Sequence, residues 1–277
     1  MRKYNKNSFS MKIALAQISV VQGDVSKNLQ KVKNFAMQAK ANNADIIMFP
    51  EMFVCGFNYK KNNEYIQAHQ NELIFELSNI AKTNNLYLCG STPHLINPTK
   101  PPTNRMHLFD NSGNEIAHYD KLHLFSVFNE HRHCSAGNKI TVVETPLGQI
   151  GLAICYDLRF PRLFETMAEM GANIVLLSAG WPYPRSEHWQ ILTKARAIEN
   201  QFFVVAVNQC GTECFGEKKI EYFGLSQAID PWGNVIAQCN KDIPDSLAFA
   251  DINLQDVIDV RKKIPVHTDK RNDIYLT

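Results

Sequence analysis

Three short segments of the sequence each place a reactive side chain at the end of an apolar run. Glu51 follows the letters DIIMFP, Lys121 follows the end of a hairpin-like segment, and Cys155 closes the run GLAIC. A carboxylate can serve as a general base, a fixed ammonium can stabilise an oxyanion, and a thiol can attack a carbonyl carbon. Together these side chains are suited to the hydrolysis of a carbonyl compound through a covalent intermediate.

Each of the three residues also has an ordinary structural interpretation when it is taken alone. Cys155 precedes a helix expected near Pro161, and the positive end of a helix favours a thiolate. A buried structural thiol is nevertheless the commoner role for any one of the seven cysteines. Glu51 alone would be a solvated loop acid, and Lys121 alone a surface lysine. The hypothesis therefore depends on all three residues together.

Two further groups of residues hint at metal binding and are set aside. His131, His133 and Cys134 form H-x-H-C but lack a second ligand pair, so we expect a structural role for them. Cys210 and Cys214 lie four residues apart in what is expected to be a glycine-containing loop, again without a matching pair. No phosphate-binding glycine motif is present either, which leaves nucleotide binding without support. No metal is expected.

Apolar segments that alternate with amphipathic ones predict the elements that must position these side chains. We expect strands at 12–20, 45–49, 86–89, 173–178, 202–207 and 247–252, helices after Asp24, around Leu73, near Pro161 and over 187–200, and hairpin turns at 111–114, 146–148 and 231–234. Strands that alternate with helices, with hairpins between them, predict an α/β fold with mixed sheets covered on both faces. The absence of a linker-like stretch predicts one domain over residues 12–277.

Composition excludes several classes of partner and compartment. The 277 residues carry a net charge of only +2, which argues against binding nucleic acid or an anionic membrane, and no run approaches the roughly 20 apolar residues of a membrane helix. Residues 1–11 are interpreted as a disordered lead-in without a signal peptide, with Met11 as an alternative to Met1 as the start. An odd number of cysteines without regular spacing favours a reducing, cytoplasmic location.

The segments MFPEMF, YDKLHLF and AICYDLRFP together resemble the Glu–Lys–Cys signature of the nitrilase superfamily of carbon–nitrogen hydrolases. The resemblance extends from about Lys12 to about Tyr275. It implies a four-layer αββα sandwich that forms a homodimer or a higher homo-oligomer through its helical faces. It also implies catalytic roles for Glu51, Lys121 and Cys155, places a second glutamate of the site at Glu130, and requires no metal or organic cofactor.

Within this superfamily, the segments PEMF with GF, EH with AG, and WP through HWQ resemble the bacterial omega-amidases. The resemblance implies that the chain releases ammonia from a small carboxylate-bearing amide of the α-ketoglutaramate type. Glu51 would take the proton of Cys155, and a thioester would form. Lys121 and the backbone N–H of Tyr156 would hold the oxyanion.

Candidate substrate contacts in the sequence are one arginine and four aromatic residues. Arg159 is suited to a bidentate contact with a substrate carboxylate, and an ion pair with a structural acid is an equally open interpretation. Four aromatic residues are expected to wall the pocket: Phe53, Phe57, Tyr156 and Trp181.

Three alternatives to an omega-amidase stay open at this point. The same chemistry would act on deaminated glutathione, a carbamoylated amine, or a simple aliphatic amide or nitrile. A non-catalytic scaffold on the same fold predicts loss of one of the three key residues, and none is missing. A papain-like hydrolase needs a histidine base paired with the cysteine, and the segments around Cys155 do not match that pattern.

Overall fold

Two six-stranded mixed sheets form the framework of the protein. The computed structural model describes residues 10–215, 217–271 and 273–274. The first sheet has the order β14-β1-β2-β3-β4-β5, with β1 at Ser10–Gln17, β2 at Ile46–Met48, β3 at Tyr87–His94, β4 at Thr103–Phe109, β5 at Glu115–Asp120 and β14 at Ser246–Asn253. The second has the order β13-β12-β9-β8-β7-β6, with β6 at Val142–Thr145, β7 at Gly148–Ile154, β8 at Ile174–Ala179, β9 at Phe203–Asn208, β12 at Gln227–Ile229 and β13 at Val235–Gln238.

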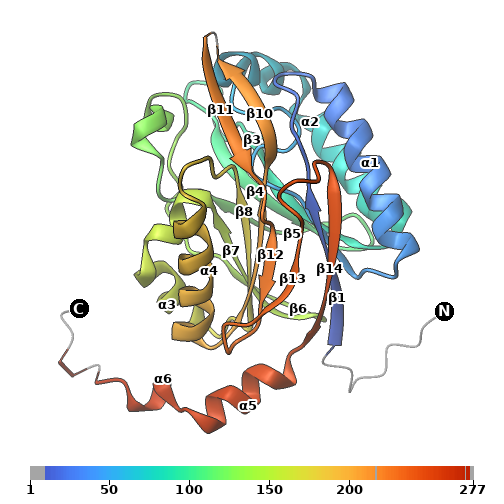
Figure 1. Ribbon diagram of the computed structural model, residues 1–277. Helices are drawn as coiled ribbons and strands as arrows, with labels where there is room; N and C mark the ends of the chain where they lie inside the picture. Colours follow the sequence, from blue (N-terminus) through green and yellow to red (C-terminus); the bar gives the residue numbers. More distant parts are fainter. Residues whose placement is uncertain (1–9, 216, 272, 275–277) are drawn as a thin grey trace.

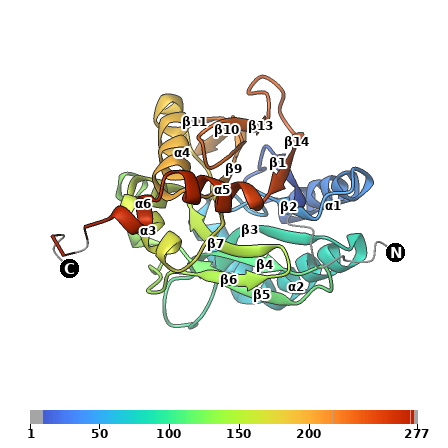
Figure 2. The same ribbon diagram turned by 90° about the horizontal axis from the view of Figure 1, so that it is seen from below.

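Helices cover the outer face of each sheet, as Figure 1 shows. The first sheet carries α1 (Val25–Ala41) and α2 (Tyr59–Asn84), and the second carries α3 (Pro161–Glu169) and α4 (Ser186–Asn200). After β14 the chain continues into α5 (Gln255–Lys263) and α6 (Val266–Asp269), which lie beneath the two sheets (Figure 2). None of the helices in the described ranges is long and apolar enough to cross a membrane.

The hydrophobic core has three parts, one between each pair of neighbouring layers. Side chains from both sheets, such as Leu15 and Leu152, fill the central part. Val32 of α1 packs in the part beneath the first sheet's helices, and Phe164 of α3 in the part beneath the second sheet's helices. Each such fully buried side chain stabilises the fold by roughly 1.5–3 kcal/mol. The predicted four-layer αββα sandwich is confirmed.

Local signals in the sequence account for several element boundaries. Asp24 caps α1 by accepting a 3.0 Å hydrogen bond from the backbone N–H of Lys27. Pro161 occupies the first position of α3, where its missing N–H costs no helical hydrogen bond. Asn85 ends α2 in the left-handed conformation, with φ of 49°. The helix starts predicted at Asp24 and Pro161 are therefore confirmed.

The structure corrects two expectations from the sequence. Ser10 and Met11, placed in a disordered lead-in, already belong to β1, where Met11 pairs with Ile252 of β14. Residues 1–9 lie outside the described residues, and so does the choice between Met1 and Met11 as the start. The segment with Cys210 and Cys214 is not a loop but strand β10 (Cys210–Phe215), which forms a hairpin with β11 (Lys218–Phe223).

Candidate active site

Four residues from distant parts of the chain meet at one end of the two sheets. Glu51 follows β2, Lys121 follows β5 directly, and Cys155 follows β7 directly. Glu130 opens the 3₁₀ turn η2 (Glu130–Arg132). All four are residues that the sequence singled out, and the structure brings them together.

Lys121 is the centre of this cluster. Its Nζ donates to Glu51 Oε1 at 2.7 Å and to Glu130 Oε2 at 2.9 Å. The side chains of Lys121, Glu51 and Glu130 are at most 2% exposed. Burial by itself would lower the pKa of Lys121, but the charges of Glu130 and Glu51 outweigh it and hold that pKa well above its usual range. Lys121 is therefore a permanent cation.

Hydrogen bonds fix both the carboxylate and the backbone carbonyl of Glu51. Oε1 accepts from Lys121 and from Asn104 Nδ2 at 2.8 Å, and Oε2 accepts from the backbone N–H of Gly180 at 2.9 Å. Its backbone carbonyl accepts from Gln209 Nε2 at 2.7 Å. A buried carboxylate with this many donors has one fixed orientation, and in that orientation it raises the pKa of the neighbouring Cys155 thiol.

Cys155 lies in a strained turn. Its φ of 45° is in the left-handed region, which costs on the order of 1 kcal/mol or more for a residue with a Cβ. Burial, followed by the charge of Glu51, raises the pKa of the thiol well above its usual range, although Lys121 acts in the opposite direction. The sequence suggested that a helix end would favour the thiolate. In the resting site desolvation and Glu51 outweigh that effect, and the thiol keeps its proton.

Asn104 on β4 is a member of the site that the sequence analysis missed. Its Nδ2 donates to Glu51 Oε1 at 2.8 Å and to Glu130 Oε1 at 3.2 Å, and its backbone carbonyl accepts from the N–H of Lys121. Side chains alternate between the two faces of β4, and this pattern could have identified Asn104. Asn104 shares the inward face with the core residues Met106 and Leu108.

Asp157 is a second missed residue, and it fixes the turn that carries Cys155. Its Oδ2 accepts from the backbone N–H of Ile154 at 2.9 Å and from the hydroxyl of Tyr119 at 2.8 Å. Its Oδ1 lies 2.7 Å from His123 Nδ1. Asp157 therefore ties the Cys155 turn to the residues on both sides of Lys121.

Arg159 has surroundings that distinguish between its two interpretations. Its guanidinium lies 4.8 Å from the ring centroid of Trp181, and Nη2 lies 3.1 Å from His188 Nδ1. Within the described part of the chain, no carboxylate lies within ion-pair distance of Arg159. The ion pair with a structural acid, one of the two open interpretations, is therefore absent from the described residues, and this partly exposed cation is free to meet an anion.

The four residues of the expected aromatic wall lie in different surroundings. Tyr156 is partly exposed and packs 4.8 Å from Phe125, and Phe57 lies against Gly180 beside Glu51. Trp181 is 3% exposed and carries Arg159 on its face. Phe53 is fully buried, because its ring stacks on Phe49 and lies close to Gly90. It belongs to the core beneath α1 and α2 and not to a pocket wall.

The residues that hinted at a metal site contribute to packing. His133 stacks on Tyr59 with 5.0 Å between ring centroids, and Cys134 is buried. Across the described ranges, no three His, Cys, Asp or Glu side chains are placed to hold a metal ion together.

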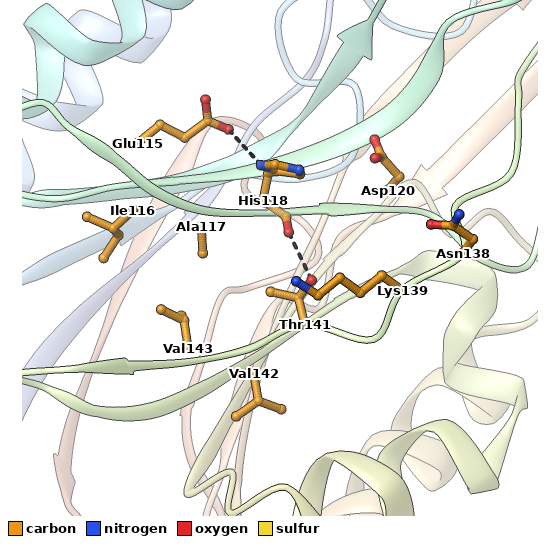
Figure 3. Close-up of a pocket in the computed structure, with 10 residues that line it drawn as sticks. All are labelled: Glu115, Ile116, Ala117, His118, Asp120, Asn138, Lys139, Thr141, Val142 and Val143. Atoms are coloured by element: carbon orange, nitrogen blue, oxygen red, sulfur yellow. Dashed lines mark hydrogen bonds and ion pairs between the residues drawn. The ribbon is translucent and has the colours of Figure 1, made fainter. Parts of the chain in front are cut away.

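A separate hollow lies on the outside of the molecule between β5 and the segment leading into β6 (Figure 3). Glu115, His118 and Lys139 are among its lining residues, and a hydrogen bond between Thr141 and the His118 carbonyl crosses it. None of the four candidate residues lines this hollow. The candidate active site therefore lies elsewhere in the molecule.

A four-layer sandwich with a cysteine beside a buried Glu–Lys–Glu cluster defines the nitrilase-like class of hydrolases. The sequence profile of that class, "Carbon-nitrogen hydrolase", matches residues 12–262. The chain belongs to the carbon–nitrogen hydrolase family, and the expectation of an enzyme that cleaves carbon–nitrogen bonds of amides is confirmed.

Relatives with assigned activities cover nearly the whole chain. A 2-oxoglutaramate amidase of Bacillus subtilis is 33% identical over 95% of this chain and 98% of its own length. A deaminated glutathione amidase of Dictyostelium discoideum is also 33% identical, over 95% of each chain. A crystal structure of a mutant amidase from Nesterenkonia, with acrylamide added to its active-site cysteine, superimposes with a TM-score of 0.80 at 25% identity, covering 94% of this chain and 99% of that one.

Proposed function

We propose that this enzyme hydrolyses the terminal amide of a small carboxylate-bearing compound, such as the omega-amide of a 2-oxo acid, and releases ammonia. The observation that carries the proposal is a Glu51 carboxylate that Lys121 and Asn104 hold in place and that acts on the buried thiol of Cys155. The 2-oxoglutaramate amidase among the relatives supports this class of substrate.

The first half of the reaction forms an acyl-enzyme. Glu51 takes the proton of Cys155 as the sulfur attacks the amide carbonyl carbon. Lys121 and the backbone N–H of Tyr156 stabilise the negative charge that develops on the carbonyl oxygen. Glu51 returns its proton to the departing nitrogen, the carbon–nitrogen bond breaks, and ammonia leaves a thioester on Cys155. The cysteine adduct in the related amidase supports the choice of nucleophile.

The second half returns the enzyme to its starting state. Glu51 takes a proton from water, the hydroxide attacks the thioester, and the carbon–sulfur bond breaks to release the carboxylic acid and the thiol. Glu130 acts through Lys121, whose ammonium it holds at 2.9 Å. No step of this cycle requires a metal or an organic cofactor.

Arg159 supplies the proposed contact for the substrate carboxylate. Its guanidinium is oriented by Trp181 and His188 and has no acidic partner within the described ranges. A planar guanidinium held in one orientation is suited to bind a carboxylate through two hydrogen bonds. Tyr156, Phe57 and Trp181 would enclose the chain between the two ends of the substrate.

An amidase acting on deaminated glutathione is the second candidate, because the relative with that activity is equally similar in sequence. Carbamoylated amines, simple aliphatic amides and nitriles would use the same chemistry. Ammonia release from a panel of these compounds separates the candidates, and the highest kcat/KM is expected for α-ketoglutaramate.

Replacement of the nucleophile tests the chemistry itself. Cys155→Ala should abolish ammonia release and leave the circular dichroism spectrum unchanged. Mass spectrometry of the wild-type enzyme, quenched during turnover, should detect an acyl adduct on the peptide that contains Cys155. Appreciable turnover by Cys155→Ala, or an adduct on another residue, would contradict the mechanism.

Assembly and location complete the proposal. We propose a homodimer formed through a helical face, supported by the exposed side chains of Ile191 and Ile198 on α4, which are 61% and 52% accessible. Light scattering should give twice the chain mass, and Ile191→Lys should lower it. A cytoplasmic location is supported by the seven cysteines, all of which are free thiols.

A further inference from the structure

A buried acid that the proposed mechanism does not use lies on the β10–β11 hairpin. Glu213 is 4% exposed, and its Oε2 accepts a 3.2 Å hydrogen bond from the hydroxyl of Tyr222, which is 3% exposed. Its other oxygen, Oε1, is buried and has no partner among the described residues. A buried carboxyl oxygen without a partner costs free energy, so such a group indicates either a functional role or a missing ligand.

A continuous series of contacts joins this acid to the reacting groups. The Tyr222 ring stacks on Phe57 with 6.1 Å between centroids, and Phe57 lies so close to Gly180 that a Cβ there would be 2.6 Å from its ring. The N–H of Gly180 donates to Glu51 Oε2. Tyr222 lies within electrostatic range of both Glu51 and Cys155, and Glu213 lies within electrostatic range of Glu51.

The same hairpin also borders the segment that holds Arg159. Trp181 carries the guanidinium on its face, and the next residue, Pro182, pairs with Tyr222 through an isolated β-bridge. The hairpin and the proposed carboxylate contact therefore both border the segment 180–182.

The Glu213 carboxyl has a pKa near neutral pH. Burial raises the pKa of its carboxyl to about 7, the negative charge of Glu51 acts in the same direction, and the hydroxyl of Tyr222 and the nearby amide of Gln22 oppose the shift. Cys55, from the turn after β2, also faces Glu213. Burial raises the pKa values of both Cys55 and Tyr222, so neither group ionises near pH 7.

We propose that Glu213 and Tyr222 form a subsite for the acidic end of the amide substrate, where a protonated Glu213 donates a hydrogen bond from Oε1 to a substrate oxygen. This inference rests on the proposed function and specifies how the site selects its substrate. Ionised Glu213 would add a third carboxylate to Glu51 and Glu130 and would repel an anionic amide. A neutral amide would not be affected in this way.

Binding to the Cys155→Ala variant tests this subsite independently of turnover. Calorimetry from pH 6.5 to 8.5 would compare glutaramate, which carries a carboxylate, with pentanamide, a neutral amide of the same chain length. The Kd of glutaramate should rise roughly tenfold or more over this range, as expected for a group that must be protonated to bind its ligand. The Kd of pentanamide should change less than twofold.

Two further substitutions in the same background assign the effect. With Glu213→Gln, which cannot ionise, the Kd of glutaramate should be independent of pH. Glu221→Gln removes an exposed charge from the same hairpin and should leave the pH dependence intact. The subsite is refuted if Glu213→Gln keeps the original pH dependence, or if both amides respond equally to pH. Absence of ammonia release by the wild-type enzyme would refute the proposed function and not the subsite.

Discussion

The hydroxyl of Tyr119 donates a 2.8 Å hydrogen bond to the carboxylate of Asp157, and both residues are buried. Tyr119 lies near the end of β5, two residues before Lys121, and Asp157 lies two residues after Cys155. The bond therefore connects the two sheets at the site. It sets the position of the thiol relative to the ammonium.

Tyr119→Phe should destabilise the protein, because it removes one donor from a buried carboxylate. The loss should be roughly 1–3 kcal/mol in urea unfolding, with a reduction in kcat. Tyr65→Phe is a suitable control, since Tyr65 is only partly buried and its hydroxyl has no hydrogen bond within the described part of the structure. Equal stabilities of the two variants would show that the Tyr119 bond is not structural.

Asn104→Leu should lower kcat roughly 10- to 100-fold and change KM little, because both carboxylates lose a shared donor and Glu51 loses its fixed orientation. Asn84→Ala is the matched control. It removes the buried Asn84 side chain, whose hydrogen bond is to the Ile80 carbonyl within α2. It should lower stability without lowering kcat. Similar kinetic losses in both variants would mean that Asn104 has only a structural role.

Arg159→Met should act on substrates according to their charge. A charge-assisted hydrogen bond contributes about 1.5–3 kcal/mol, so kcat/KM for an anionic omega-amide should fall roughly 10- to 100-fold. The value for a short neutral amide should change little, as measured by ammonia release. An equal loss with both substrates would remove the carboxylate contact from Arg159.

The Cys155 thiol should stay protonated throughout the neutral range, because burial and Glu51 raise its pKa well above 9.0. The difference in absorbance at 240 nm between wild type and Cys155→Ala reports this thiolate alone. No thiolate step should appear between pH 6 and 9. A step in that range would show that the helix end dominates over desolvation.

Glu213 should make stability depend on pH. Its pKa is raised from 4.5 to about 7 by folding, so the folded state holds this proton more tightly than the unfolded state. The resulting stabilisation is fully present below pH 4.5 and is lost as pH rises through 7. Urea unfolding of Glu213→Gln, compared with wild type at pH 5 and pH 8, should show the variant gaining relative stability at pH 8. A constant difference would contradict the shift.

Much of the architecture could be predicted from the chain. Period-two and helical patterns, the cap at Asp24 and the proline at Pro161 are local properties, and they located most strands and helices. The β10–β11 hairpin escaped prediction because the polar residues of β10, such as Glu213, resemble those of a loop until the fold buries them. The burial of Phe53 was not predicted for a related reason, because an aromatic ring beside a reactive residue in the sequence can face either the pocket or the core.

The sequence by itself identified the proposed reacting groups, because Glu51, Lys121 and Cys155 each occur in a short motif that can be recognised without coordinates. Only the tertiary structure decided how they are held. Asn104 and Asp157 act through contacts between residues far apart in the chain, as the bond from Asn104 to Glu51 illustrates. The protonation states of Cys155 and Glu213 were likewise decided by burial and neighbouring charge. Desolvation and Coulomb interactions depend on distances in space, and a linear sequence does not contain those distances.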